Sequence, residues 1–262
     1  MMKERFEKRE KGFSLVEISI VIVIIGLITA GVTSAQSIIK SSKIQAQILD
    51  FQKYKVAYNS FKEQFNALPG DFKRASDYFG VAVPNGNGNN YIDGGLDNVM
   101  PPSEVMLFFH HLSLAKMVPE KHEMVFHLDI GYPHLKLDKT KGMTAGGRFG
   151  GFGSTANYGY QVTVTPDYIA VLNLQAGQAH LNGPGNYPRR QFNNFEGTAT
   201  AETYFLIDQK IDDGVARQGI FKAYRAWSAH YPYRGDCLTG LNGDYLLTND
   251  IPLCHAYYIF EQ

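Results

Sequence analysis

The sequence predicts an α+β protein in which a long N-terminal helix lies against a small antiparallel sheet. Residues 13–32 form an apolar run of twenty residues in which Glu17 is the only charge. Beyond this run, apolar residues recur every three or four positions as far as residue 68, which is the helical period. Segments of alternating apolar residues, which are typical of strands, come only later in the chain.

The composition fits a globular protein and disfavours a nucleic-acid binder. Of the 262 residues, 44% are hydrophobic and 19% are charged, and 25 basic residues balance 25 acidic ones. A chain without net positive charge lacks the electrostatic basis for binding a phosphate backbone. No HExxH, GxSxG or Walker sequence occurs, so we expect neither an enzyme nor a cofactor.

The apolar run predicts a membrane-spanning half of the helix over residues 13–33. Twenty helical residues span about 30 Å, which is the thickness of the hydrocarbon core of a bilayer. Residues 1–12 carry a net charge of +2, so we expect this end to stay cytoplasmic while the rest of the chain crosses. The alternative, a soluble core helix, seldom has so long a run that is apolar on every face.

The second half of the helix, residues 34–68, is predicted to be amphipathic. Its apolar side chains share one face, and Pro69-Gly70 should end the helix. These side chains are Ile44, Ile48, Phe51, Tyr54, Tyr58, Phe61, Phe65 and Leu68. Because their period continues beyond Ala35, a secretory signal peptide cleaved near that residue is disfavoured.

The rest of the chain, residues 69–262, is predicted to form a head domain outside the membrane. The Gly- and Asn-rich stretch at 84–98 should be a loop. We expect helices at 103–117 and 200–213, two strands joined by a turn at 158–165 and 168–174, and further strands at 219–227 and 256–260.

The residues at the start of the apolar run carry a family resemblance. Gly12-Phe13-Ser14-Leu15-Val16-Glu17, between a short basic leader and an apolar run, resembles the cleavage and methylation signal of type IV prepilins and type II secretion pseudopilins. The resemblance implies that a prepilin peptidase removes the leader, residues 1–12, by cutting between Gly12 and Phe13, and that Phe13 is N-methylated. Stretches such as 68–71 and 207–214 resemble long prepilin-like proteins of the minor-pilin kind.

Glu17 is a candidate functional residue because a carboxylate in a membrane helix costs about 2.5–3.5 kcal/mol at the helix centre and needs a partner. Cleavage would create an ammonium at Phe13, one helical turn away, and the two could pair within a subunit or between neighbours. The resemblance implies that Glu17 meets the N-terminal amine of an adjacent subunit and sets the register of assembly. The alternative is that Glu17 reaches the cytoplasmic headgroups as a spectator.

The two cysteines, Cys237 and Cys254, both lie beyond the membrane segment. An even pair in an oxidising compartment predicts a disulfide, and the resemblance agrees, because pilins commonly have a C-terminal loop closed by one. Two free buried thiols are the alternative. A metal pair is disfavoured because only His255 lies close in sequence.

Two groups of polar residues are weak candidates for cation sites. The first has oxygen atoms at alternating positions, faintly as in an EF-hand loop: Asn85, Asn87, Asn89 and Asp93. Asn90 holds its glycine position and Leu96 its closing Glu position, so a plain turn is favoured. The second group, Asp208, Asp212 and Asp213, lies at a predicted helix C-terminus, where carboxylates are either solvated, which is favoured, or fixed by a cation or a basic partner.

The sequence therefore predicts a pilin-like structural subunit of a type IV pilus or a type II secretion pseudopilus. Before assembly it should be held in the inner membrane, with a cytoplasmic N-terminus and a periplasmic head. Its expected partners are prepilin peptidase, other pilin or pseudopilin subunits, and an inner-membrane assembly platform. The alternative is a signal-anchored periplasmic enzyme or ligand-binding protein that does not polymerise.

Overall fold

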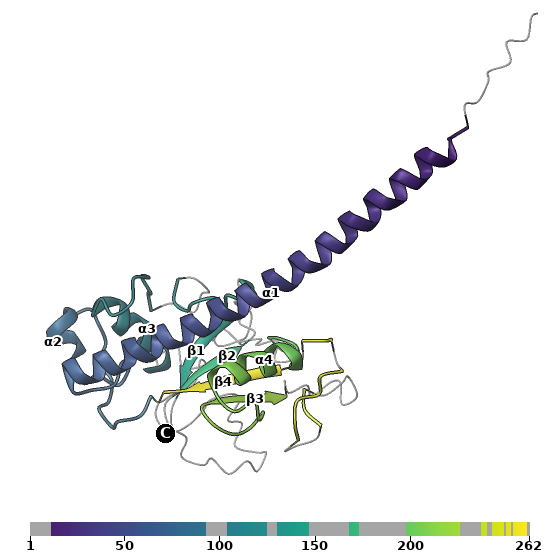
Figure 1. The fold of residues 1–262 in the computed structure, drawn as a ribbon. Helices are drawn as coiled ribbons and strands as arrows, with labels where there is room; N and C mark the ends of the chain where they lie inside the picture. Colours follow the sequence, from purple (N-terminus) through teal and green to yellow (C-terminus); the bar gives the residue numbers. More distant parts are fainter. Residues whose placement is uncertain are drawn as a thin grey trace, which may run out of the picture. The chain divides into compact units, whose positions relative to one another are not determined.

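The computed structural model confirms the α+β class. It describes residues 12–92, 104–124, 130–146, 168–172, 198–225, 237–239, 243–248, 250–252 and 254–260. Its elements in chain order are α1 (Leu15–Phe65), α2 (Ala75–Phe79), α3 (Glu104–Leu114), β1 (Gly142–Gly146), β2 (Tyr168–Leu172), α4 (Ala201–Ile211), β3 (Phe221–Arg225) and β4 (Cys254–Ile259) (Figure 1). The chain divides into two compact units, residues 1–43 and 44–262.

In the second unit, the C-terminal part of α1 provides one side of the hydrophobic core. Its aromatic residues follow one another at three- and four-residue spacing, which places them on one face of the helix. The ring of Phe51 stacks on Tyr258 with centroids 5.3 Å apart, and Tyr58 stacks on Phe260 at 4.8 Å. The opposite face, with Gln52 and Glu63, is exposed. The amphipathic half predicted from the sequence is therefore present.

Helix α1 ends slightly earlier than the sequence predicts. Asn66 adopts a left-handed conformation with φ 49°, a common way for a helix to stop. The predicted terminator, Gly70, has a different role. Its φ is +93°, and a Cβ atom there would overlap the backbone carbonyl oxygen of Glu104 at the start of α3. Gly70 therefore allows the turn after α1 to pack directly on α3.

The sheet has the strand order β1-β2-β4-β3, and all neighbouring strands in it are antiparallel. Strand β4, near the end of the chain, lies between β2 and β3 (Figure 1). Register pairs such as Ala170↔Tyr257 and Ala223↔Ala256 join segments that are far apart in sequence. Helix α4 packs on β3 and β4, and α3 contacts β1.

Most of the predicted elements of the head are present with shifted ends. The helices expected at 103–117 and 200–213 correspond to α3 and α4, and the strands expected at 168–174, 219–227 and 256–260 correspond to β2, β3 and β4. The strand expected at 158–165 lies outside the described residues. Strand β1 was not predicted, because two of its five residues are glycine and its residues from Gly142 to Ala145 are all buried, which gives no alternating pattern.

His111 on α3 is fully buried and joins α3 to the turn that follows α1. Its Nδ1 accepts a hydrogen bond of 3.0 Å from the backbone N–H of Gly70, so this nitrogen carries no proton. Its ring lies parallel to that of Phe61, with centroids 6.3 Å apart. Burial, with a smaller contribution from the neighbouring His110, lowers the pKa of His111 to about 4.

Acidification should therefore favour unfolding through His111. His111 binds a proton near pH 6.5 in the unfolded chain and only near pH 4 in the folded protein. The contribution of neutral His111 to the free energy of unfolding is therefore complete above pH 6.5, and it decreases by about 2 kcal/mol between pH 7 and pH 5. Chemical unfolding of the detergent-solubilised protein at a series of pH values measures this loss.

The variant His111→Asn, whose amide can still accept near the position of Nδ1, should flatten the pH dependence of the unfolding free energy. Burial also lowers the pKa of His122 to about 4, so the double variant with His122→Asn should be flatter still. An unchanged slope in His111→Asn would contradict the assignment of the effect to this histidine.

Candidate functional site

The three described residues directly before α1 are exposed. Gly12, Phe13 and Ser14 precede the first helical residue, and the side chain of Phe13 is 82% exposed. A Cβ atom built on Gly12 meets nothing within 4 Å. The described structure therefore gives no internal reason for a glycine at position 12. A requirement for it would come from a molecule that recognises the Gly12–Phe13 peptide bond.

Glu17 caps the N-terminus of its own helix. Its carboxylate accepts a hydrogen bond of 2.8 Å from the backbone N–H of Ser14, and the hydroxyl of Ser14 accepts one of 3.4 Å from the N–H of Val16. This is a capping box, which satisfies amides that have no partner within the helix. The spacing Ser-x-x-Glu is its signature, and our sequence analysis did not use it. The cap holds the Glu17 carboxylate at the backbone N–H of Ser14, the residue that follows Phe13.

The first unit contains the membrane-length part of α1. Large apolar side chains from Leu15 to Val32 are between 46% and 87% exposed, and the helix is long and apolar enough to cross a membrane. Side-chain hydroxyls in this stretch bond back to helix carbonyls, as Thr29 does to Ile25 and Gly26 at 3.0 Å. Polar groups satisfied within the helix cost little in lipid, whereas exposed apolar groups cost much in water.

The comparison with known protein families identifies the N-terminal motif of the chain. The prokaryotic N-terminal methylation motif matches residues 8–33. This motif places the chain in the type IV pilin and pseudopilin family. The match covers the motif and the apolar helix only, and no curated protein and no solved structure matches the chain. Membership of this pilin family implies processing by a prepilin peptidase and, with the apolar helix, indicates anchoring in a membrane.

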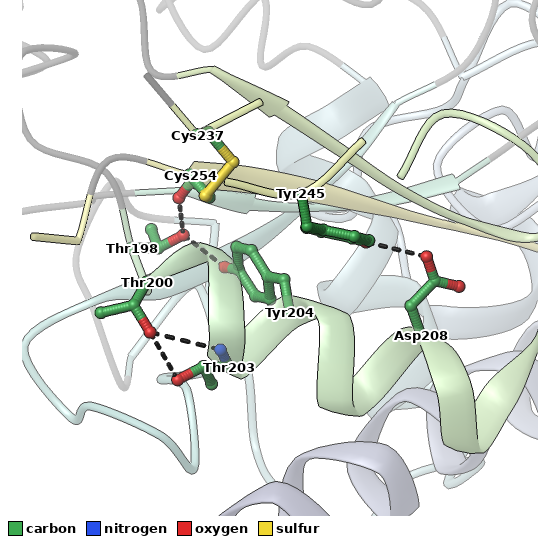
Figure 2. Close-up of a disulfide and its surroundings, with 8 residues drawn as sticks. All are labelled: Thr198, Thr200, Thr203, Tyr204, Asp208, Cys237, Tyr245 and Cys254. Atoms are coloured by element: carbon green, nitrogen blue, oxygen red, sulfur yellow. Dashed lines mark hydrogen bonds between the residues drawn. A yellow bond between two sulfur atoms is a disulfide. The ribbon is translucent and has the colours of Figure 1, made fainter. Parts of the chain in front are cut away.

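The pilin head contains a disulfide between Cys237 and Cys254, the first residue of the central strand β4. The backbone N–H of Leu246 donates to the carbonyl oxygen of Cys237 at 2.9 Å, and Leu238 forms a β-bridge with Tyr245. The disulfide thus links the bridged segments of Leu238 and Tyr245 to the first residue of the interior strand β4 (Figure 2).

Helix α4 is tied to the same strand through Thr198 and Tyr204. The hydroxyl of Thr198 donates to the carbonyl oxygen of Cys254 at 2.8 Å and also bonds the phenol of Tyr204 (Figure 2). Tyr204 is fully buried, and burial raises its pKa above the ordinary range. At the helix start, Thr200 is the N-cap, and its hydroxyl accepts from the N–H of Thr203 at 3.2 Å.

The asparagines of the EF-hand-like candidate are used as turn residues. Asn85 Oδ1 accepts from the N–H of Ser76 at 2.8 Å. The side-chain oxygen of Asn87 accepts from the backbone N–H of Asn89 at 2.9 Å, and that of Asn89 accepts from the N–H of Tyr91 at 2.9 Å. These are the local side-chain bonds that make asparagine a turn former. Asp93, the fourth residue of this candidate, lies outside the described residues.

The loop after α2 instead closes around a carboxylate of the protein itself. Asp71, which is buried, accepts backbone N–H bonds from Gly88 at 2.5 Å, Asn89 at 3.1 Å and Asn90 at 2.7 Å. Burial raises the pKa of Asp71, and these amides and Glu104 oppose the increase. Amides that converge on one point favour an anion there, and Asp71 supplies it.

The structure brings the acids at the end of α4 together. Carboxylate oxygens of Asp208, Asp212 and Asp213 lie within 4.8 Å of one another. Asp213 is exposed, as the favoured interpretation of a solvated surface requires, and Asp212 is half-buried. For Asp208 that interpretation is wrong, because this residue has no exposed surface and its carboxylate accepts a hydrogen bond from the phenol of Tyr245.

Removal of the disulfide should destabilise the head. Cys237→Ala with Cys254→Ala opens a link across a sequence separation of 17, which the chain-entropy model values at roughly 3 kcal/mol. Denaturant unfolding of the double variant, compared with the oxidised protein, measures the loss. Thiol titration of the denatured protein should find no free thiol before reduction and two after it. Two reactive thiols before reduction would contradict the bond.

Proposed function

We propose that this chain is a structural subunit of a type IV pilus or a type II secretion pseudopilus. A prepilin peptidase would cut it between Gly12 and Phe13, Phe13 would be N-methylated, and the subunit would assemble through its N-terminal helix. The observation that carries this proposal is the family motif directly before a membrane-length apolar helix that continues unbroken to Phe65.

The course of the backbone supports a cut at Gly12 over a cut near Ala35. Gly12 and Phe13 lie outside regular structure, in a segment that a protease can bind in extended form. Ala35 lies within α1, where a cut requires local unwinding. A cut at Gly12 leaves the whole of α1 on the mature protein, whereas a cut near Ala35 would remove its apolar half.

The capping interaction suits the proposed role of Glu17 in register. Cleavage would place an ammonium on Phe13, next to Ser14, whose N–H holds the carboxylate. A charge buried in lipid is strongly destabilising alone and nearly neutral when paired, so a subunit would be held where its Glu17 meets the amine of a neighbour. Two subunits out of register would leave both the Glu17 carboxylate and the N-terminal amine without a partner.

The proposed setting follows from the same features. Before assembly, the apolar half of α1, residues 13–33, would lie in the inner membrane with the head, residues 69–262, in the periplasm, where the disulfide can form. The partners would be prepilin peptidase, other pilin or pseudopilin subunits and an inner-membrane assembly platform. Since pilin subunits are generally not enzymes, we propose no catalytic activity, and the size of the head favours a minor subunit.

Processing is tested by the intact mass of the protein from membranes of a host with prepilin peptidase. The mature chain should lack residues 1–12 and carry one added methyl group on Phe13. Gly12→Ala should abolish this processing without a loss of head stability, because its Cβ meets nothing within 4 Å. An intact N-terminus, or a cut near Ala35, would reject the proposal in favour of an anchored or secreted periplasmic protein.

The role of Glu17 in assembly can be separated from its role in capping. Glu17→Gln keeps a capping side chain but removes the charge, whereas Ser14→Ala keeps the charge and removes the capping hydroxyl. Breaking a buried ion pair costs about 3–5 kcal/mol, so Glu17→Gln and Glu17→Ala should be cleaved normally yet appear in sheared fibres at about one hundredth of the usual amount or less.

Ser14→Ala serves as the matched control and should still enter fibres. Incorporation of Glu17→Gln at the level of the unmodified protein would remove the charge-pairing role and leave Glu17 as a helix cap only.

A further inference from the structure

The loop after α2 contains two asparagine–glycine sequences, Asn85-Gly86 and Asn87-Gly88. In such a sequence the backbone nitrogen of the glycine can attack the side-chain carbonyl carbon of the asparagine, because glycine has no Cβ atom that hinders the approach. Both asparagines are exposed, so water can reach them. The surroundings of the two glycine nitrogens differ, and this difference distinguishes the two positions chemically.

The backbone N–H of Gly88 donates to a carboxylate, which is a base. It reaches Oδ1 of Asp71 at 2.5 Å, and Asp71 is only 2% exposed. The N–H of Gly86 donates instead to the backbone carbonyl oxygen of Phe72 at 3.0 Å, and a carbonyl is a much weaker base. A general base has to lie within hydrogen-bond distance of the group whose proton it removes. Burial raises the pKa of Asp71, which makes its carboxylate a stronger base.

The side-chain oxygen of Asn87 is bonded to a donor at the place where negative charge would develop. Asn87 Oδ1 accepts from the N–H of Asn89 at 2.9 Å, and the same N–H also donates to Asp71 at 3.1 Å. When a nitrogen attacks Cγ of Asn87, this oxygen becomes negative, and an N–H already in position stabilises it. The proton that Asp71 gains from Gly88 in the same step neutralises the carboxylate, so two negative charges do not accumulate.

Contacts on both sides of the Asn87–Gly88 bond fix it in this place. The N–H of Asn87 donates to Glu104 Oε1, at the start of α3, at 2.8 Å. After Gly88, which has φ +74°, the N–H of Asn90 donates to the second oxygen of Asp71 at 2.7 Å. The reacting groups and the base are therefore ordered by the fold before the reaction, which lowers the entropy cost of reaching the transition state.

We propose that Asn87 is a site of self-catalysed deamidation, in which Asp71 acts as the general base. Asp71 takes the proton of the Gly88 N–H, and the nitrogen attacks Cγ of Asn87. A bond forms between this nitrogen and Cγ, the bond from Cγ to Nδ2 breaks, and ammonia leaves with the proton that Asp71 returns. Water then opens the resulting succinimide ring at either carbonyl, which leaves aspartate or isoaspartate. Overall, one amide and one water give one carboxylic acid and ammonia.

The reaction would alter the charge of this loop. It replaces a neutral amide with a carboxylate next to two buried acids, Asp71 and Glu104, and like charges so close together repel. The modified loop should therefore be held less firmly against α3. Asn89 has a similar arrangement, since the N–H of Asn90 donates to Asp71 and the N–H of Tyr91 to Asn89 Oδ1. Asn90 has a side chain where Gly88 has none, so Asn89 should react more slowly.

The test compares the folded full-length protein in detergent with the same chain in denaturant. After incubation at neutral pH, peptide mass spectrometry with fragmentation gives the converted fraction of Asn85 and Asn87 separately. In denaturant the two should convert at similar rates, because glycine follows both. In the folded protein, Asn87 should convert about tenfold faster than Asn85 or more, and faster than in denaturant. Slower conversion of Asn87 in the folded protein than in denaturant would overturn the proposal.

The variant Asp71→Asn separates the base from the hydrogen-bond acceptor. It keeps a side-chain oxygen for the loop amides but removes the carboxylate, so conversion of Asn87 should slow by about tenfold or more. Asp250→Asn, an exposed acid outside this loop, is the matched control and should convert Asn87 as the unmodified protein does. An unchanged rate in Asp71→Asn would overturn the proposal.

The pH profile distinguishes catalysis by Asp71 from a merely structural effect of the variant. With Asp71 as the base, the rate at Asn87 in the folded protein should be nearly level from neutral to alkaline pH, because the carboxylate stays ionised there. In denaturant, and in Asp71→Asn, the rate should rise with the hydroxide concentration. A rise of the same steepness in the unmodified folded protein would contradict the role of Asp71. The measurement needs no filament and no peptidase, so its outcome is independent of the proposed function.

Discussion

Helix α1 must suit two different environments, one for each of its halves, along one continuous run of backbone hydrogen bonds. Between Leu15 and Val32 its large apolar side chains are exposed on every face, which favours surroundings of lipid. From Ile44 to Phe61 one face carries the aromatic side of the head's core. Because the backbone amides beyond the first turn of the helix are paired within it, the same element can pass from one environment to the other.

The head is arranged around this second half of α1. Strands β3 and β4 bring Phe221 and Tyr258 against Phe51, and α3 brings Phe109 against Tyr54 with centroids 5.2 Å apart. Strand β4, the last of the four in chain order, lies between β2 and β3, so the sheet depends on pairings between segments that are far apart in sequence. The disulfide then fixes the turn before β4 to that central strand.

Several carboxylates of this protein accept hydrogen bonds from backbone amides in loops or at the start of a helix or strand. Glu17 accepts from the amide of Ser14, the residue before α1. Asp71 accepts from three amides of the loop after α2, and Asp212 accepts from two amides where β3 begins. Each of these acids is compensated by donors of the protein itself. Asp208 differs, because its Oδ1 is buried and has no hydrogen-bond partner within the part of the chain that the structure describes.

Local patterns predicted the elements but not their partners. The spacing of Phe51, Tyr54 and Tyr58 identified a buried helical face, and Thr200 marks the cap of α4. Strand β1 escaped prediction because its glycines have weak strand propensity and its burial comes from α3 and β2. Asp208 was expected to be solvated, since nothing near it in sequence indicates that a tyrosine 37 residues away donates to it.

The sequence by itself determined the processing motif, the membrane-length helix and the family, because these depend on residues that are adjacent or one helical turn apart. Only the tertiary structure decided that Asp71 accepts the amides of the 88–90 loop and that Asp208 is buried and accepts a hydrogen bond from Tyr245. The physical reason is that burial and hydrogen-bond satisfaction are set by atoms brought together in space, and no local period along the chain records which distant segments meet.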